Sequence, residues 1–380
     1  MKSRSMQLFS IILILLLTHL SQAFATGFGQ DNNINDQSSK SQKADPTIRE
    51  LADKAGIMIG VRAFLRNDAQ KAIVEKEFNT STRTCYPKEI NPTPDQNNIE
   101  NFNTGVNWFY ERGMKPMHHM LFGPNQYEAE WVKKITSAAE LETLMKERIK
   151  VIMESNDNAT KVNSWNIVNE AIGTGGKYRT EENMLWAIMG YEDDKSGLTG
   201  DDKINDKHPV FIRKAFEYVS QYAKGKLELR ETGIETPCIK ARAFYQLVRH
   251  LQQSGVRIDA VGFQCHFGID EGRRLNPQGL AYEISKYKKA GVEVYFTEVD
   301  FGRKKAPWTP ELGQKQKEEY KKLMTVALNE GVSQVHFWGL RDADENWLRE
   351  ENPLLYDENL KPKPAYYGVK EALTEYLKRK

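Results

Sequence analysis

Eight short apolar runs alternate with longer amphipathic stretches after residue 46, and this alternation constrains the fold more than any other feature. Runs of this length, bounded by turn residues, are typical of buried strands, and apolar residues at three- and four-residue spacing are typical of helices. The predicted strands are residues 57–61, 76–79, 115–121, 164–169, 227–229, 260–264, 292–297 and 334–338. The clearest helical patterns cover residues 210–222, 239–254, 277–290 and 312–329. Eight repeated βα units predict a single α/β domain, a closed parallel (β/α)8 TIM barrel.

The first 45 residues follow a different pattern. Lys2 and Arg4 precede an unbroken apolar run at 11–17, and Ala23-Phe24-Ala25 is a small-x-small cleavage sequence. We expect a signal peptide at 1–25, a flexible tether at 26–45 and the barrel domain at 46–380, with the mature chain secreted or periplasmic. No cysteine lies directly after the cleavage sequence, where a lipid anchor would be attached. An uncleaved amphipathic anchor is the alternative to cleavage.

The charge balance limits the classes of partner that the chain can bind, and the cysteine count limits its disulfides. Lys plus Arg number 54 against 52 for Asp plus Glu, and the net charge of +2 gives no support to a nucleic-acid or membrane partner. Cys85, Cys238 and Cys265 are too few for a disulfide framework, although one disulfide stays open. We expect a monomer, and no nucleotide motif or metal-ligand spacing suggests a cofactor or a metal. An acidic insertion at 192–202 is either a solvated loop or a calcium site.

Two of the predicted strand ends carry a carboxylate directly after an apolar run. Glu170 follows the strand at 164–169, and Glu298 follows the residues of the strand at 292–297. The carboxyl ends of barrel strands converge on one mouth, so these side chains are expected to face each other there. Two facing carboxyl groups suit glycoside hydrolysis, and a separation of about 5–5.5 Å suits its retaining form. The alternative is that each Glu belongs to a structural ion pair.

Several motifs in order along the chain resemble glycoside hydrolase family 10, whose best-known members are endo-β-1,4-xylanases. The resemblance covers roughly residues 52–377. The matching segments are Trp165-Asn166-Ile167-Val168-Asn169-Glu170, Phe211 to Tyr218, Val256 to His266, Phe296-Thr297-Glu298-Val299-Asp300-Phe301, and Trp338-Gly339 with Asp342 and Trp347.

The resemblance implies a role for each matching residue. Glu170 would be the acid/base and Glu298 the nucleophile of a retaining double displacement on xylan. Asn169 would bind the 2-hydroxyl of the attached sugar, and His266 would hydrogen-bond Glu298, with Gln264 beside it. Trp338 would form an apolar wall against the sugar ring. The other substrate-binding residues implied by the resemblance are Lys88 and His118.

Departures from the family pattern cluster on the second, third and fifth predicted strands. Residues 82–88 keep the family's lysine as Lys88 but lack a glutamate and an asparagine. Residues 116–123 keep one histidine as His118, and 230–232 replace an Asn-Asp-Tyr segment, which alters the rim. Removing polar groups that would bind sugar hydroxyls changes which sugar is accepted. Xylan is therefore the first candidate, and the alternatives are a different or heavily decorated β-linked polysaccharide and a non-catalytic carbohydrate-binding barrel.

Overall fold

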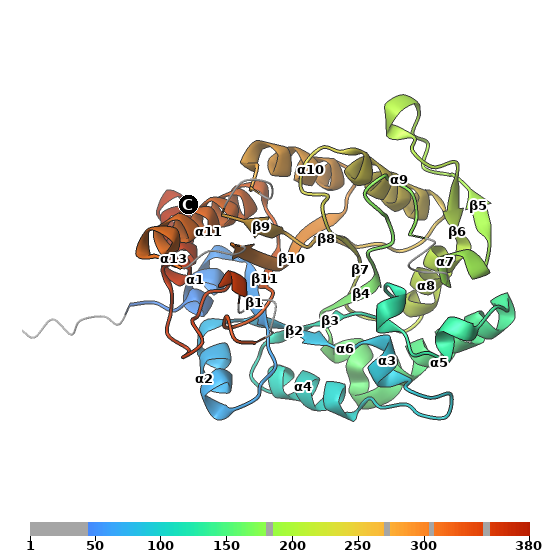
Figure 1. The fold of residues 1–380 in the computed structure, drawn as a ribbon, viewed down its shortest axis with the longest axis horizontal. Helices are drawn as coiled ribbons and strands as arrows, with labels where there is room; N and C mark the ends of the chain where they lie inside the picture. Colours follow the sequence, from blue (N-terminus) through green and yellow to red (C-terminus); the bar gives the residue numbers. More distant parts are fainter. Residues whose placement is uncertain (1–44, 180–184, 270–273, 304–307, 345–349) are drawn as a thin grey trace, which may run out of the picture. The chain divides into compact units, whose positions relative to one another are not determined.

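The computed structural model describes residues 45–179, 185–269, 274–303, 308–344 and 350–380. The predicted signal peptide, nearly all of the tether and Trp347 lie outside the described residues. Residues 46–380 form one compact unit. In this unit a ring of helices surrounds the strands (Figure 1).

Eight parallel strands close into a barrel, which confirms the predicted fold class. Each strand pairs with the next, and β11 pairs with both β10 and β1 to complete the ring. In order around the barrel, the strands are β1 Met58–Arg62, β2 Thr80–Thr84, β3 Lys115–His119, β4 Ser164–Asn169, β7 Lys226–Glu231, β8 Ala260–Phe263, β10 Glu293–Gly302 and β11 Gln334–Phe337. A short strand, β9 (His266–Gly268), pairs with the end of β10.

The helices that cover the barrel begin where the sequence offers capping residues. Asn276 accepts a hydrogen bond from Gly279 N and Thr309 accepts one from Leu312 N, each just before a proline. The α-helices are α1 Ile48–Ala55, α2 Asp68–Glu77, α3 Pro87–Ile90, α4 Glu100–Tyr110, α5 Ala138–Glu154, α6 Asn158–Lys161, α7 Leu185–Ile188, α8 Val210–Ser220, α9 Ile239–Gln253, α10 Pro277–Lys289, α11 Pro310–Glu330 and α13 Pro364–Arg379. None of the described helices is long and apolar enough to cross a membrane.

The prediction of the second strand is wrong. Residues 76 and 77 are the end of α2, and the strand begins at Thr80. The sequence of β2 is TSTRT, so no apolar run marks it. Its hydroxyls are buried and bonded: Ser81 Oγ donates to Val61 O, and Thr82 Oγ1 lies 2.9 Å from His336 Nδ1.

The interior of the barrel is partly polar, whereas the apolar core lies between the strands and the helices. Met117, Ala260 and Tyr295 form a small apolar cluster inside the barrel, separate from the main core. Glu228 and Arg230 are also fully buried. The three cysteines are free, so no disulfide holds the described part of the chain together.

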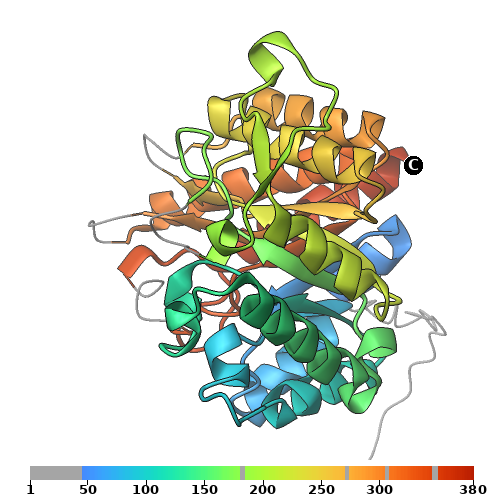
Figure 2. The ribbon, with the colours of Figure 1, turned by 90° about the vertical axis from the view of Figure 1, so that its right-hand side faces the viewer.

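An antiparallel hairpin, β5 (Tyr191–Asp193) and β6 (Lys207–Pro209), is inserted between β4 and α8. Its loop projects beyond α9 in both views (Figures 1 and 2). The hairpin carries the acidic insertion at 192–202, and Glu192 and Asp194 turn inward to bond Arg213, His208 and His250.

Candidate active site

A cavity of about 230 Å³ lies where the barrel strands end, and both predicted carboxylates line it. Its lining residues come from segments far apart in the sequence. They are Arg62, Tyr86, His119, Tyr127, Asn169, Glu170, His266, Glu298 and Trp338. The cavity therefore brings together Asn169, Glu170, His266, Glu298 and Trp338, as predicted from the sequence.

Glu298 lies on β10, almost fully buried, and positively charged groups meet both of its oxygens. Arg230 Nη1 donates to Oε1 at 3.1 Å, and His266 Nε2 lies 3.3 Å from Oε2. Burial alone would raise the pKa of Glu298, but the hydrogen bond from His266, together with the nearby His119 and Arg230, lowers it to about 2. The carboxylate is thus ionised at neutral pH, as a nucleophile requires.

His266 reaches Glu298 because a second carboxylate orients its ring. Its Nδ1 lies 2.7 Å from Asp300 Oδ2, and β9 pairs with β10 so that His266 and Asp300 are in register. Burial opposes the charged form of His266, but Asp300 and Glu298 together raise its pKa well above the usual value. The ring is therefore a cation that bridges two carboxylates.

Glu170 follows directly after β4, with its backbone at φ 55°, in the left-handed region. Its amide donates to Arg230 O, which holds it to β7. Gln264 Nε2 donates to Glu170 Oε1 at 2.9 Å, and Arg179 Nη1 lies 3.8 Å from Oε2. Gln264 thus joins the two carboxylate residues: its side chain contacts Glu170, and its backbone oxygen accepts a hydrogen bond from Glu298 N at 3.0 Å. A partly exposed carboxyl group opposite a buried carboxylate can exchange protons with a substrate while the other attacks.

Aromatic rings and an arginine form the walls of the cavity. The Arg62 guanidinium lies 4.4 Å from the centre of the Trp338 ring, and His119 packs edge-on against the same ring at 5.1 Å. Tyr86 and Tyr127 stack on each other with ring centres 4.7 Å apart. Flat aromatic faces of this kind suit the apolar faces of a sugar ring.

The prediction that His118 contacts substrate is wrong. His118 is fully buried and packs between Phe102 and Trp165, away from the cavity. Successive residues of a strand point to opposite faces, so His119 points toward the site and His118 toward the helices. Burial lowers the pKa of His118 to about 3, so it is neutral.

Lys88 also lies outside the cavity lining. It is exposed on α3, and its Nζ donates to Gln126 O at 3.0 Å and lies 5.9 Å from the Tyr127 ring. Its contact with the site is therefore indirect, through the loop that carries Tyr127.

Five residues that line the cavity or donate to Glu298 were not predicted from the sequence: His119, Arg62, Tyr86, Tyr127 and Arg230. His119 could have been identified from the alternation of inward and outward residues in Lys115–His119. Arg62 could have been identified as a residue that directly follows an apolar run. The tyrosines lie in loops after β2 and β3 and carry no comparable signal. Arg230, which was expected on the rim, is instead fully buried below the cavity.

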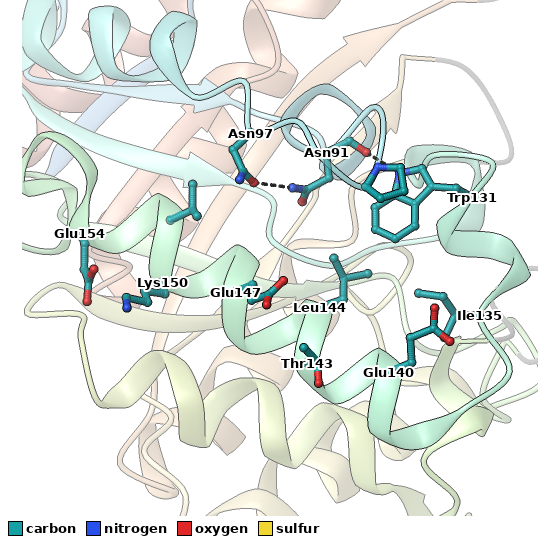
Figure 3. Close-up of a pocket in the computed structure, with 12 residues that line it drawn as sticks. Asn91, Asn97, Trp131, Ile135, Glu140, Thr143, Leu144, Glu147, Lys150 and Glu154 are labelled. Atoms are coloured by element: carbon teal, nitrogen blue, oxygen red, sulfur yellow. Dashed lines mark hydrogen bonds between the residues drawn. The ribbon is translucent and has the colours of Figure 1, made fainter.

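A larger groove of about 620 Å³ lies on the outside of the barrel, beside α5 (Figure 3). Glu140 and Glu147 of α5 form one wall. Asn91, Asn97 and Trp131 form the other, joined by hydrogen bonds from Trp131 Nε1 to Asn91 O and from Asn91 Nδ2 to Asn97 Oδ1. None of the predicted site residues lines this groove, and its carboxylates lie on one helix. The groove therefore lacks two carboxyl groups on different elements, such as those that line the cavity at the barrel mouth.

Among the described residues, Asp194, His208 and His250 are a group that could hold a metal ion, with ligand atoms within 4.8 Å of one another. Protein partners already engage both histidines. His208 Nε2 lies 2.9 Å from Asp194 and its Nδ1 meets Tyr178 Oη, while Lys195 N donates to His250 Nδ1. The rings stack with centres 4.1 Å apart. A metal would have to break these hydrogen bonds, so the arrangement fits a closed polar network better.

Comparisons with known proteins agree with this geometry. The sequence model of glycosyl hydrolase family 10 matches residues 47–372. Endo-1,4-beta-xylanase B of Thermotoga neapolitana is 26% identical over 354 residues, which cover 88% of this chain and 94% of that protein. The crystal structure of native xylanase 10B from Thermotoga maritima superposes with a TM-score of 0.76 at 26% identity, covering 88% of this chain and 100% of that one. Xylanase 10B from Thermotoga petrophila RKU-1, solved in complex with xylobiose, gives the same TM-score and identity, with 88% and 99% covered.

Proposed function

The chain belongs to glycosyl hydrolase family 10, and we propose that it is an exported, retaining endo-β-1,4-xylanase. One observation carries the proposal: Glu170, which follows β4, and Glu298 of β10 line the same small cavity. Their surroundings differ in the way that the chemistry requires. Glu298 is buried between two cations, whereas Glu170 is partly exposed and hydrogen-bonded to an amide.

In the first step the Glu298 carboxylate attacks the anomeric carbon of the sugar in the cavity. The bond from that carbon to the glycosidic oxygen breaks, and Glu170 gives its proton to the departing oxygen. The negative charge on Glu298 is consumed as the new ester bond forms. Asn169, at the edge of the same cavity, hydrogen-bonds the 2-hydroxyl of the attached sugar.

In the second step a water molecule displaces Glu298 from the anomeric carbon. Glu170, now a carboxylate, accepts a proton from the water as its oxygen bonds the anomeric carbon, and the electron pair of the ester bond returns to Glu298. His266 and Asp300 keep Glu298 in place through both steps. Two inversions at the same carbon leave the product with the configuration of the substrate.

Xylan is the first substrate candidate because the matching relatives are named xylanases and one is solved with xylobiose. A second cavity, of about 410 Å³, shares His266 with the first and is lined by Thr232, Glu235 and Phe267 among others. A chain with one sugar beside Glu298 could extend past His266 toward this second cavity. A second cavity next to the first favours a polymer over a small glycoside.

A different or decorated β-linked polysaccharide is the second candidate, on the same chemistry. Tyr86, Tyr127 and Arg62 line the catalytic cavity, and none of them belongs to the motifs that carry the family resemblance. These bulky side chains shape the space around the reacting sugar. They would favour a sugar or a substituent that stacks on a ring.

Export rests on the signal-like pattern at residues 1–25. We propose cleavage after Ala25, which would leave the tether at 26–45 on the mature enzyme. Mass spectrometry of the N-terminus of the protein recovered outside the cytoplasm tests this directly. A mature chain that still begins at Met1 would contradict it.

The function is tested by incubating residues 26–380 with a panel of xylans and other β-glycans and measuring new reducing ends. Glu298→Gln should fold normally and release none. Proton NMR of the first products should show the β-anomer before mutarotation, and an initial α-anomer would refute retention. Tight binding with no release from any polymer would support the non-catalytic barrel instead.

A further inference from the structure

A buried ion pair lies inside the barrel, directly below the proposed nucleophile. Arg230 and Glu228 are adjacent inward-facing residues of β7, and neither has any exposed surface. Arg230 Nε donates to Glu228 Oε1 at 2.7 Å, and Nη2 lies 3.3 Å from Oε2. These two hydrogen bonds form a fork that fixes the plane of the guanidinium group.

The neighbouring strands make room for this pair. Gly262 of β8 lies where a side chain would collide with it: a Cβ there would lie 2.2 Å from Glu228 Oε1. Ser164 of β4 donates from Oγ to Glu228 Oε2 at 3.3 Å. A buried pair of charges is costly unless its remaining lone pairs and protons are satisfied. Here Glu228 bonds Nε and Nη2 of Arg230, so Nη1 must find its hydrogen-bond partners above the pair, toward the cavity.

That end of Arg230 points at the site. Its Nη1 donates to Glu298 Oε1 at 3.1 Å and lies 3.0 Å from His119 Nδ1. His119 is kept neutral by burial, which lowers its pKa well below the usual value, so Arg230 is the permanent cation on this oxygen. His266, backed by Asp300, holds the other oxygen.

The remaining charged groups around Glu298 lie across the cavity. Arg62 of β1 and Glu170 after β4 line the same cavity as Glu298. His336 of β11 is buried beneath, bonded to Thr82, and burial lowers its pKa to about 3. Of the cations around Glu298, Arg230 and His266 are those that contact its oxygens.

We propose that Arg230 is a positioning residue for the reaction: anchored by Glu228, it fixes Oε1 of Glu298 and holds that carboxylate in its charged form. This inference rests on the proposed function, since it gives Glu298 the role of nucleophile. Glu298 loses its charge when the ester bond to the sugar forms and regains it when water breaks that bond. A fixed cation on Oε1 therefore slows the first step and speeds the second, so that less of the covalent intermediate accumulates than would without it.

A first experiment reads the charge of Glu298 without any substrate. Protein labelled with ¹³C at glutamate carboxyls is titrated by NMR, and Glu298→Gln identifies the Glu298 signal. Arg230→Met should raise the midpoint of this titration by about one pH unit or more, because an opposite charge at contact distance is removed. Arg230→Lys should recover part of the shift. An unchanged midpoint in a folded Arg230→Met would overturn the proposal.

Arg230→Met leaves Glu228 buried without a partner, which could prevent folding. The double variant Glu228→Gln with Arg230→Met removes both charges together and keeps the side chains similar in size. If Arg230 serves only to neutralise Glu228, the double variant should titrate like the wild type. If the proposal holds, the double variant folds and Glu298 still titrates at a higher pH.

A second experiment uses an activated aryl xyloside, with which the first step is fast. The acid limb of the pH profile of kcat/KM should move to higher pH in the double variant, and the pre-steady-state burst of the aryl alcohol should be larger than in the wild type, because the second step is slowed relative to the first. A limb that stays in place, with a burst no larger than that of the wild type, would refute the role of Arg230. Absence of turnover by the wild type would refute the proposed function alone, since the NMR titration needs no substrate.

Discussion

The stacked histidines under the β5–β6 hairpin should make the enzyme lose stability as the pH falls below 7. His208 is fully buried, and burial, aided by the neighbouring His250, lowers its pKa from 6.5 to about 4 in spite of Asp194. The unfolded chain takes up a proton near pH 6.5, whereas the folded chain does not until about pH 4. The stability from this group is therefore present above pH 6.5 and lost as the pH falls toward 4.

The size of the loss follows from the two pKa values. Each unit of difference corresponds to about 1.4 kcal/mol, and the unfolded state binds the extra proton over most of the range from about 6.5 to 5. The free energy of unfolding should thus fall by about 2 kcal/mol between pH 7 and pH 5 through His208 alone, and by about 3 kcal/mol at pH 4. The neutral, buried His118 and His336 add to the total but are unchanged in a His208 variant.

His208→Gln isolates this contribution. Urea unfolding at pH 7, 6 and 5, followed by tryptophan fluorescence, gives the free energy of unfolding of wild type and variant. The drop between pH 7 and pH 5 should be about 2 kcal/mol smaller in the variant, whatever its stability at pH 7. Tyr178→Phe is the matched control, because it removes a hydrogen bond to the same ring and no group that titrates in this range. Equal drops in wild type and His208→Gln would refute the reasoning.

Three further substitutions test the packing of the barrel and the walls of the site. Gly262→Ala should lower the free energy of unfolding by about 2 kcal/mol or more, because its Cβ meets Glu228; thermal unfolding measures this, and an unchanged Tm would contradict the packing. Glu128→Gln should cost about 3–5 kcal/mol, because Arg148, at 2.8 Å and 1% exposed, would lose the negative charge that neutralises it and keep only amide oxygens as partners; a cost under about 1 kcal/mol in urea would contradict this. Trp338→Ala should lower kcat/KM on xylo-oligosaccharides about tenfold or more with the fold intact, since an apolar wall is removed, and an unchanged value would exclude Trp338 from the substrate site.

The barrel was predictable because most of its strands are buried on both faces. β4 is buried along its whole length and β10 at every residue after the first, and large apolar residues stand on both faces of each strand. Turns separate the strands from helices that end within a few residues of the predicted bounds. β2 was not predicted correctly, because side chains with hydroxyl groups, and not apolar ones, fill the barrel interior at this strand. Thr82 hydrogen-bonds His336, which lies 254 positions away in the sequence. No local sequence pattern indicates a contact over that distance.

The site was predictable where a residue's role depends on a strand end, as for Glu170 and Glu298. It was not predictable where the choice depends on which face of a strand is inside. His118 and His119 are adjacent and chemically identical, and one position of register decides between core and cavity. Arg230 was missed for another reason: its place beneath Glu298 follows from the barrel's interior packing, with Glu228 and Gly262 on two strands making room for it.

Glu170 occupies a backbone conformation that a glycine would adopt more readily. Its φ of 55° belongs to the left-handed region, where a side chain beyond Cα costs about 1 kcal/mol. The local preference of the chain and the need for a carboxyl group at this place therefore oppose each other. Replacement of Glu170 by glycine would relax the backbone at this position, and in the proposed mechanism it would also remove the acid/base.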